Sequence, residues 1–188
     1  MKTNRSSWQL IALLLVLTCL GIVPSSGMAA PVQELEREAD LAIEKLYRTT
    51  PVAKKLAAEA NGVLVFPSII KAGLMIGGQH GKGVLRVDGE TTGYYKSTSV
   101  SYGLQIGAQK FGYALILMTP DAVDYLESSQ GWEVGVGPSV VVVDEGIAKS
   151  LSTTTAKDEI YAFVFGQEGL MAGVSLEGSK ITKFVPEE

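Results

Sequence analysis

GLMAGVSLEGS (Gly169–Ser179), which comes shortly after the aromatic run IYAFVF (Ile160–Phe165), is the stretch that decides the fold of this chain. Glycine weakens a strand unless the backbone must bend or approach another group closely. Its repeated use among apolar residues therefore predicts a strongly curved sheet. The stretch carries no obvious catalytic group, so it indicates architecture rather than chemistry.

From Gly62 onward, glycines also separate short apolar runs. These runs predict strands at Val63–Phe66, Ala72–Gly77, Gly83–Val87, Thr92–Lys96, Tyr102–Lys110, Tyr113–Met118, Glu133–Val136, Val140–Val143, Ile160–Phe165, Leu170–Leu176 and Ile181–Val185. Asp88-Gly89 predicts a tight hairpin, and Gly78–Gly81 predicts another turn. Short strands joined by tight turns favour antiparallel pairing.

Helical periodicity is found at the N-terminal side of these strands, between Val32 and Asn61. Thr50 and Pro51 suit a helix start, so this region is expected to form two helices, and Thr119-Pro120-Asp121 predicts a third, short one. The expected fold is therefore α+β: a glycine-rich, mainly antiparallel curved sheet, barrel- or sandwich-like, with an N-terminal helical pair and a short mid-chain helix.

Residues 1–29 have the pattern of a secretory signal peptide, in which Lys2 and Arg5 precede the apolar run Leu10–Val23 and cleavage is expected after Ala29. The run is shorter than the roughly 20 residues that span a bilayer, and an uncleaved anchor is the alternative. Cys19, the sole cysteine, lies in this leader, where a lipoprotein-type anchor is disfavoured because the preceding residues match that signal poorly. We expect an exported protein, periplasmic, extracellular or associated with the outer envelope, with residues 30–188 as one domain.

The charge balance bears on partners. The whole chain has 16 basic and 20 acidic residues, and loss of Lys2 and Arg5 with the leader leaves 14 against 20, a net charge of −6. Bulk attraction to nucleic acid is not expected at this charge. Contact with an anionic lipid would need a local basic patch.

Two glycine motifs fail as nucleotide-binding loops. Gly81-Lys82 lacks both the earlier glycine and the following Ser or Thr of a phosphate loop. Val134-Gly-Val-Gly begins like a dinucleotide fingerprint, but Val140 occupies the place of the third glycine. Neither motif predicts a cofactor.

The titratable residues do not specify an enzyme either. His80, the sole histidine, stands between expected turn glycines, and no Gly-x-Ser-x-Gly elbow accompanies it. The acidic pairs Asp144-Glu145 and Asp158-Glu159 lack the ligand spacing of a calcium loop, and capping or solvation is the favoured interpretation of both. We expect no catalytic residue, no metal site and no cofactor.

Several runs, taken in order, resemble the SYLF lipid-binding domain family: FPSIIKAG (66–73), SYGLQIG (101–107), VGP (136–138) and the stretch Gly169–Ser179. DEG (144–146) and Ser150–Thr155, leading into Ile160–Phe165, resemble the exported bacterial branch of that family. The resemblance extends from about Leu35 to Phe184. It implies membrane binding, since eukaryotic members bind phosphoinositide membranes, often through an N-terminal amphipathic helix, and some bind actin.

The resemblance places the lipid-binding site at the helix matching that region, Val32–Arg48. Its apolar stripe either enters the lipid interface or covers the sheet, and the helix's net charge of −2 favours the sheet, because interfacial helices usually carry excess Lys and Arg. The stripe is Leu35, Ile43, Leu46 and Tyr47, and the cations expected to face anionic lipid are Arg48, Lys54, Lys55 and Lys71. Each such cation contributes about 1 kcal/mol near an anionic surface.

The leading hypothesis is a non-enzymatic lipid- or phospholipid-binding protein that associates peripherally with a membrane surface or bacterial envelope lipid. The alternative is a structural or protein-interaction module with an envelope protein as its partner. Actin binding, as in eukaryotic relatives, is less favoured for an exported bacterial protein. A hydrolase using His80 is a third and weaker hypothesis.

Overall fold

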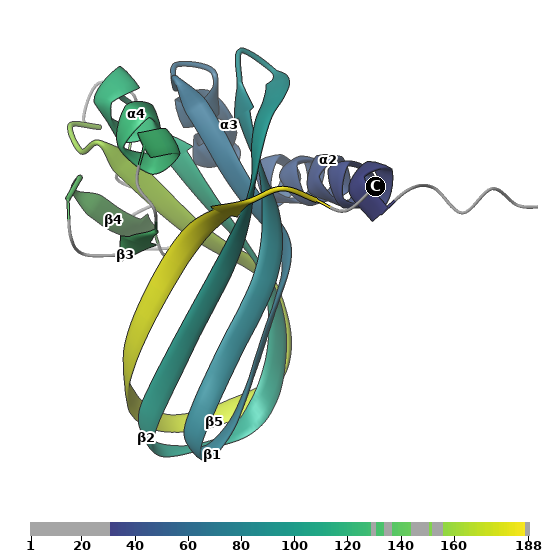
Figure 1. Cartoon of the computed structure of the whole chain (residues 1–188), viewed down its shortest axis with the longest axis vertical. Coiled ribbons are helices and arrows are strands. Elements are labelled where there is room, and N and C mark those ends of the chain that lie inside the picture. Colours follow the sequence, from purple (N-terminus) through teal and green to yellow (C-terminus); the bar gives the residue numbers. More distant parts are fainter. Residues whose placement is uncertain (1–30, 129–130, 134–136, 144–150, 152–155, 187–188) are drawn as a thin grey trace, which may run out of the picture.

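Three long strands form the body of the computed structural model (Figure 1): β1 (Gly62–Val87), β2 (Glu90–Leu117) and β5 (Ile160–Phe184). β1 pairs with β2 and β2 with β5, both antiparallel. At the free edge of β5, β3 (Trp132–Glu133) pairs antiparallel and β4 (Val140–Val143) pairs parallel. The sheet is therefore mixed, mainly antiparallel and not closed.

The structure describes residues 31–128, 131–133, 137–143, 151 and 156–186. The expected leader with Cys19, the acidic pair Asp144-Glu145 and the hydroxyl-rich run 152–155 lie outside the described residues, as does part of the strand expected at Glu133–Val136.

Each long strand runs down the molecule, bends near its middle and returns, so the sheet folds over on itself (Figure 1). In β1 the bend coincides with a register shift between Leu74 and Ile76, where Met75 has φ 62°. Further from the bend the two halves of β1 face each other closely. A Cβ added to Gly83 would lie 2.6 Å from the carbonyl oxygen of Val65, so only glycine fits there.

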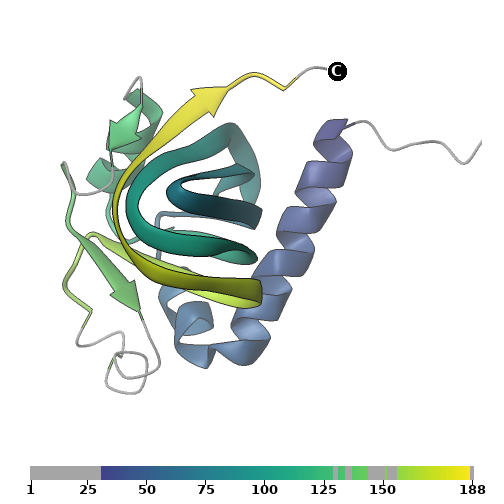
Figure 2. The same ribbon diagram turned by 90° about the horizontal axis from the view of Figure 1, so that it is seen from below.

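Three helices accompany the sheet: α2 (Pro31–Thr49), α3 (Pro51–Ala57) and α4 (Pro120–Ser128). Seen from below, α2 crosses the open side of the nested strands (Figure 2). The Thr119 hydroxyl accepts a 3.2 Å hydrogen bond from the Ala122 amide and caps α4, whereas the side chain of Thr50 makes no such cap for α3. None of the described helices combines the length and apolarity needed to cross a membrane.

Two hydrophobic cores hold these elements together. The inner core fills the folded sheet away from the bend, and α4 contributes to it; its members include Leu64, Phe66, Leu85, Leu115 and Leu126. The outer core lies between the sheet and the helical pair; its members include Ala39, Leu46, Leu56, Val65, Val84, Ile116 and Phe163. Both faces of the sheet are thus covered near its ends, but not near its bend.

The expected α+β class, the curved antiparallel sheet, the helical pair and the mid-chain helix are confirmed. The Asp88-Gly89 hairpin is also confirmed, with both residues at positive φ between paired Val87 and Glu90. The prediction of many short strands is wrong, because most of them are halves or thirds of β1, β2 and β5. The turn predicted at Gly78–Gly81 is likewise wrong: these residues lie within β1, where glycine permits close approach instead of ending a strand.

Candidate functional site

The distribution of polar and apolar side chains is reversed near the bend of the sheet. Along β2, the residues that face the inside of the fold are Ser97, Ser99, Ser101 and Gln105, each no more than 5% exposed. On the outer face, Thr98 is polar and exposed, and beyond it Val100, Tyr102, Leu104 and Ile106 are apolar and 63 to 82% exposed. The bend therefore has a polar interior and an apolar exterior.

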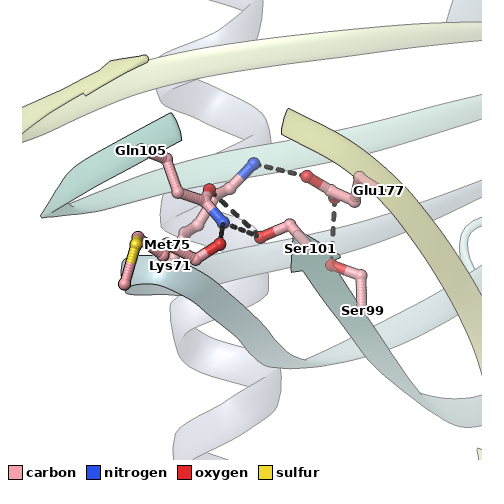
Figure 3. Close-up of polar contacts among 6 residues, drawn as sticks. All are labelled: Lys71, Met75, Ser99, Ser101, Gln105 and Glu177. Atoms are coloured by element: carbon pink, nitrogen blue, oxygen red, sulfur yellow. Dashed lines mark hydrogen bonds and ion pairs between the residues drawn. The ribbon is translucent and has the colours of Figure 1, made fainter. Parts of the chain in front are cut away.

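The polar interior links all three long strands (Figure 3). Lys71 of β1 forms an ion pair with Glu177 of β5, and the Ser99 hydroxyl donates a 2.9 Å hydrogen bond to the Glu177 Oε1. The Gln105 Nε2 donates to the Ser101 Oγ at 2.8 Å and lies 3.5 Å from the Met75 carbonyl oxygen. These groups satisfy one another, so the cluster stabilises the bend without needing a ligand.

A cavity of about 200 Å³ adjoins this cluster and is lined in part by Lys71, Tyr113 and Glu177. Burial, with a smaller effect from the Glu177 carboxylate, raises the pKa of Tyr113 to about 12. The phenol therefore stays neutral at ordinary pH and provides no base. Its position makes it a wall of the cavity.

The catalytic candidates that the structure describes are either exposed or engaged in local contacts. His80 is exposed on the outer face of β1 opposite Thr98, whereas the buried serines face the inside of the fold. Asp158 accepts a 3.3 Å hydrogen bond from the Tyr161 hydroxyl, and Glu159 accepts one of 2.8 Å from the Ser139 amide. Both carboxylates thus hold local structure.

The exterior of the bend forms one exposed apolar surface, here named the apolar tip. Its six residues are 60 to 82% exposed: Leu74, Met75, Ile76, Tyr102, Leu104 and Ile106. They are cross-strand neighbours, since Leu74 pairs with Ile106 and Ile76 with Tyr102. Leu170, on the adjoining strand β5, is also exposed. Contiguous exposed apolar surface of this kind marks an interaction site in a folded protein.

The apolar stripe predicted on the N-terminal helix lies elsewhere and is largely covered. Leu46 is 1% exposed, and Leu35, Ile43 and Tyr47 are partly buried against the outer core. Burial raises the pKa of the Tyr47 phenol. In this structure the stripe covers the sheet, and lipid contact by these residues stays a prediction.

The four predicted cations do not form one patch. Arg48 lies in the last turn of α2, and Lys54 and Lys55 lie on the neighbouring helix α3, all exposed. Lys71 instead lies inside the folded sheet, paired with Glu177. Its charge is compensated there, so it cannot share a surface with the other three.

Sequence reasoning missed the apolar tip, although a signal was present. Residues 99–106 alternate, with Ser99, Ser101, Gly103 and Gln105 on one face and Val100, Tyr102, Leu104 and Ile106 on the other. Alternation shows that the two faces differ, but the usual rule would turn the apolar face inward. The helices α2 and α3 cover the sheet only near its ends, and this could not be read from the pattern.

Comparison with known families now adds to this geometry. Residues 98–185 match the model of the family described as Ysc84, the Las17-binding protein actin regulator. No curated protein matches the chain. The matched segment contains the β2 part of the apolar tip and all of β5. The match confirms the SYLF resemblance over residues 98–185, whereas the exported bacterial branch of that family stays a prediction.

Proposed function

We propose that this protein binds membrane lipid peripherally by inserting its apolar tip into the bilayer surface. The observation that carries the proposal is the reversed polarity at the bend of the sheet. Leu104 alone leaves 82% of its surface in water, and the five other residues of the apolar tip are 60 to 71% exposed. Transfer of one such side chain from water into an apolar phase contributes about 2 kcal/mol.

The backbone of the tip is only partly paired. A polar backbone group that enters hydrocarbon without a hydrogen-bond partner costs several kcal/mol. Ile106 of β2 is paired on both sides, with Leu74 and Ala172. Leu104 is paired with Val174 of β5 alone, and β1 is an edge strand of the sheet. Insertion is therefore proposed to be shallow, so that the unpaired backbone groups stay in contact with headgroups or water.

The proposed setting is an envelope membrane reached by export, as the leader pattern suggests. The family is described as a regulator and not as an enzyme, which supports a non-enzymatic role. Peripheral binding through the tip would leave the helical pair facing away from the bilayer, because the helices cover the opposite end of the sheet (Figure 1).

Vesicle flotation tests the proposal. The full chain is mixed with neutral phosphatidylcholine vesicles at low salt and at 1 M salt, and binding is expected to survive in both because it is apolar. The double variant Leu74→Ser/Leu104→Ser should lose most of this binding. The matched control is Leu41→Ser/Val142→Ser, which removes apolar side chains that are 53% and 57% exposed on α2 and β4 and should bind normally. Equal loss in both variants, or no flotation of the unaltered chain, would refute the proposal.

A second candidate function is protein binding by the same tip. The family description names actin regulation and Las17 binding, and exposed apolar surface also suits a protein partner. Co-sedimentation with actin filaments separates the two: a partner role predicts filament binding that Leu74→Ser/Leu104→Ser abolishes, with no vesicle binding. Vesicle binding without filament binding would leave the lipid proposal standing alone.

A further inference from the structure

Two lysines that form no ion pair within the described part of the chain lie on the same outer face as the apolar tip. Lys82 of β1 and Lys96 of β2 are direct cross-strand partners, and both are exposed. Like charges directly opposite each other destabilise a strand pair. The ion pairs found among the described residues are Arg37–Glu34, Lys71–Glu177 and Arg86–Asp40, so they include neither lysine.

Two acidic residues of α2, on either side of Leu35, have hydrogen-bond or ion-pair partners other than these lysines. Glu34 forms an ion pair with Arg37 on its own helix. Glu36 accepts a 2.6 Å hydrogen bond from the Tyr94 hydroxyl. Leu35, between them, faces the lysines across a pocket. The helix thus offers the lysines an apolar side chain in place of a carboxylate.

The pocket is amphipathic and has a volume of about 370 Å³. The Lys82 and Lys96 ammonium groups lie 5.6 Å and 5.1 Å from the centroid of the Phe184 ring, within the range of cation–π attraction. The rest of the lining is apolar: Pro31, Val32, Leu35, Val185 and Pro186. Two positive charges therefore stand beside an apolar wall.

We propose that this pocket, here named the lysine pocket, binds the phosphate group of an anionic phospholipid, with the start of an acyl chain against the apolar wall. The inference rests on the proposed function and identifies the lipid class. A phosphodiester between the ammonium groups would relieve their repulsion, and the apolar lining would favour a lipid over a free anion.

A soluble lipid tests the pocket without a bilayer. Dihexanoyl-phosphatidylglycerol, kept below its micelle concentration, is titrated into the full chain while the backbone amides of Lys82, Lys96 and Phe184 are followed by NMR. Saturable shifts centred on these residues are expected, with binding of dihexanoyl-phosphatidylcholine at least tenfold weaker. Inorganic phosphate should also bind at least tenfold more weakly, because it has no acyl chain.

Charge variants give the quantitative check. Lys82→Gln/Lys96→Gln should weaken phosphatidylglycerol binding about thirtyfold, since each cation strengthens binding to an anionic surface roughly fivefold. The matched control Lys45→Gln/Lys157→Gln makes the same change in net charge at two exposed lysines outside both proposed lipid surfaces and should bind normally. Lys82→Arg/Lys96→Arg keeps both charges and should still bind phosphatidylglycerol. This variant replaces the Gln variant in the test if the latter does not fold.

Each contrary result overturns the inference. Absence of shifts, equal affinity for the two lipids, or equal loss in the control variant would exclude a specific anionic lipid site. Phosphate binding as tight as phosphatidylglycerol would make the pocket a free-anion site. The proposed function and the lysine pocket can be tested independently. Leu74→Ser/Leu104→Ser should lose vesicle binding but still bind the short-chain lipid. Lys82→Gln/Lys96→Gln should still bind neutral vesicles but lose the preference for anionic ones.

Discussion

Truncation of two leucines, Leu46 on α2 and Leu104 at the apolar tip, should have opposite effects on stability and on membrane binding. Sequence patterning assigns lipid contact to the helix stripe, which includes Leu46, whereas the structure exposes Leu104. Leu46→Ala and Leu104→Ala remove the same atoms from environments that are 1% and 82% exposed. The pair therefore compares the two surfaces with identical chemistry.

The magnitudes follow from burial. Leu46→Ala leaves a cavity in the outer core and should cost about 2–5 kcal/mol of unfolding free energy. At roughly 2–4 °C per kcal/mol for a chain of this size, the melting temperature should fall by about 5–15 °C. Leu104→Ala removes a side chain that already contacts water, so its effect on stability should stay within about 0.5 kcal/mol. For vesicle partitioning, loss of about 2 kcal/mol of apolar transfer corresponds to a roughly thirtyfold weaker affinity.

Thermal unfolding followed by circular dichroism measures the first quantity, and sedimentation with neutral vesicles at high salt measures the second. Partitioning of Leu46→Ala is to be measured well below its melting temperature and should match the unaltered chain. Two results would refute the reasoning. Equal destabilisation by both variants would mean that the tip is covered in solution, and weaker partitioning of folded Leu46→Ala than of Leu104→Ala would return the lipid surface to the helix stripe.

Three further predictions concern the fold itself. Tyr95 is fully buried and its hydroxyl has no hydrogen-bond partner among the described residues. Tyr95→Phe should therefore leave the unfolding free energy from urea titration unchanged or raise it by about 1 kcal/mol. A decrease of more than this size would contradict the prediction. Gly173 has φ 131°, and an added Cβ would lie 1.8 Å from the Leu104 carbonyl oxygen. Gly173→Ala should therefore lower the unfolding free energy by about 2 kcal/mol or more. An unchanged melting temperature of this variant would argue against the bend. Burial raises the pKa of Tyr95 to about 12, above the unfolded value of about 10, so ionisation of this phenol does not disfavour the folded state below pH 10 and disfavours it increasingly as pH rises toward 12; the unfolding free energy from urea titrations should fall over this range, and Tyr95→Phe should remove that part of the slope.

Much of the fold follows from local sequence. Pro51 and the Thr119-Pro120 pair set helix starts, and Asp88-Gly89 sets the hairpin, because these residues act through their own backbone conformation. Strand length could not be obtained in the same way. Gly81 has the pattern of a turn residue, yet in the structure it is a place where β1 approaches its own first half, a contact between segments distant along the chain.

The candidate site was harder to predict for a related reason. Hydrophobic periodicity identified the stripe of α2 correctly as one apolar face, but a stripe that covers a sheet and a stripe that enters lipid have the same period. Only the packing of Leu46 into the outer core distinguishes them. Lys82 and Lys96 are fourteen residues apart in sequence, and their pairing depends on the register of β1 with β2.

Steric constraints explain the polar interior of the bend but not its apolar exterior. A Cβ added to Gly77 would lie 2.7 Å from the Ser101 Oγ and 2.9 Å from the Gln105 Nε2, so the interior there is too narrow for Tyr102 or Leu104. This explains why small and polar side chains face inward, and why a one-residue slip of β2, which would exchange its faces, is blocked. It does not require the outer face to be apolar, since threonine or lysine would pair equally well in an exposed strand. The apolar residues outside the bend therefore have no role in folding that their contacts reveal, and a surface that costs solubility without stabilising the fold is best explained by what it binds.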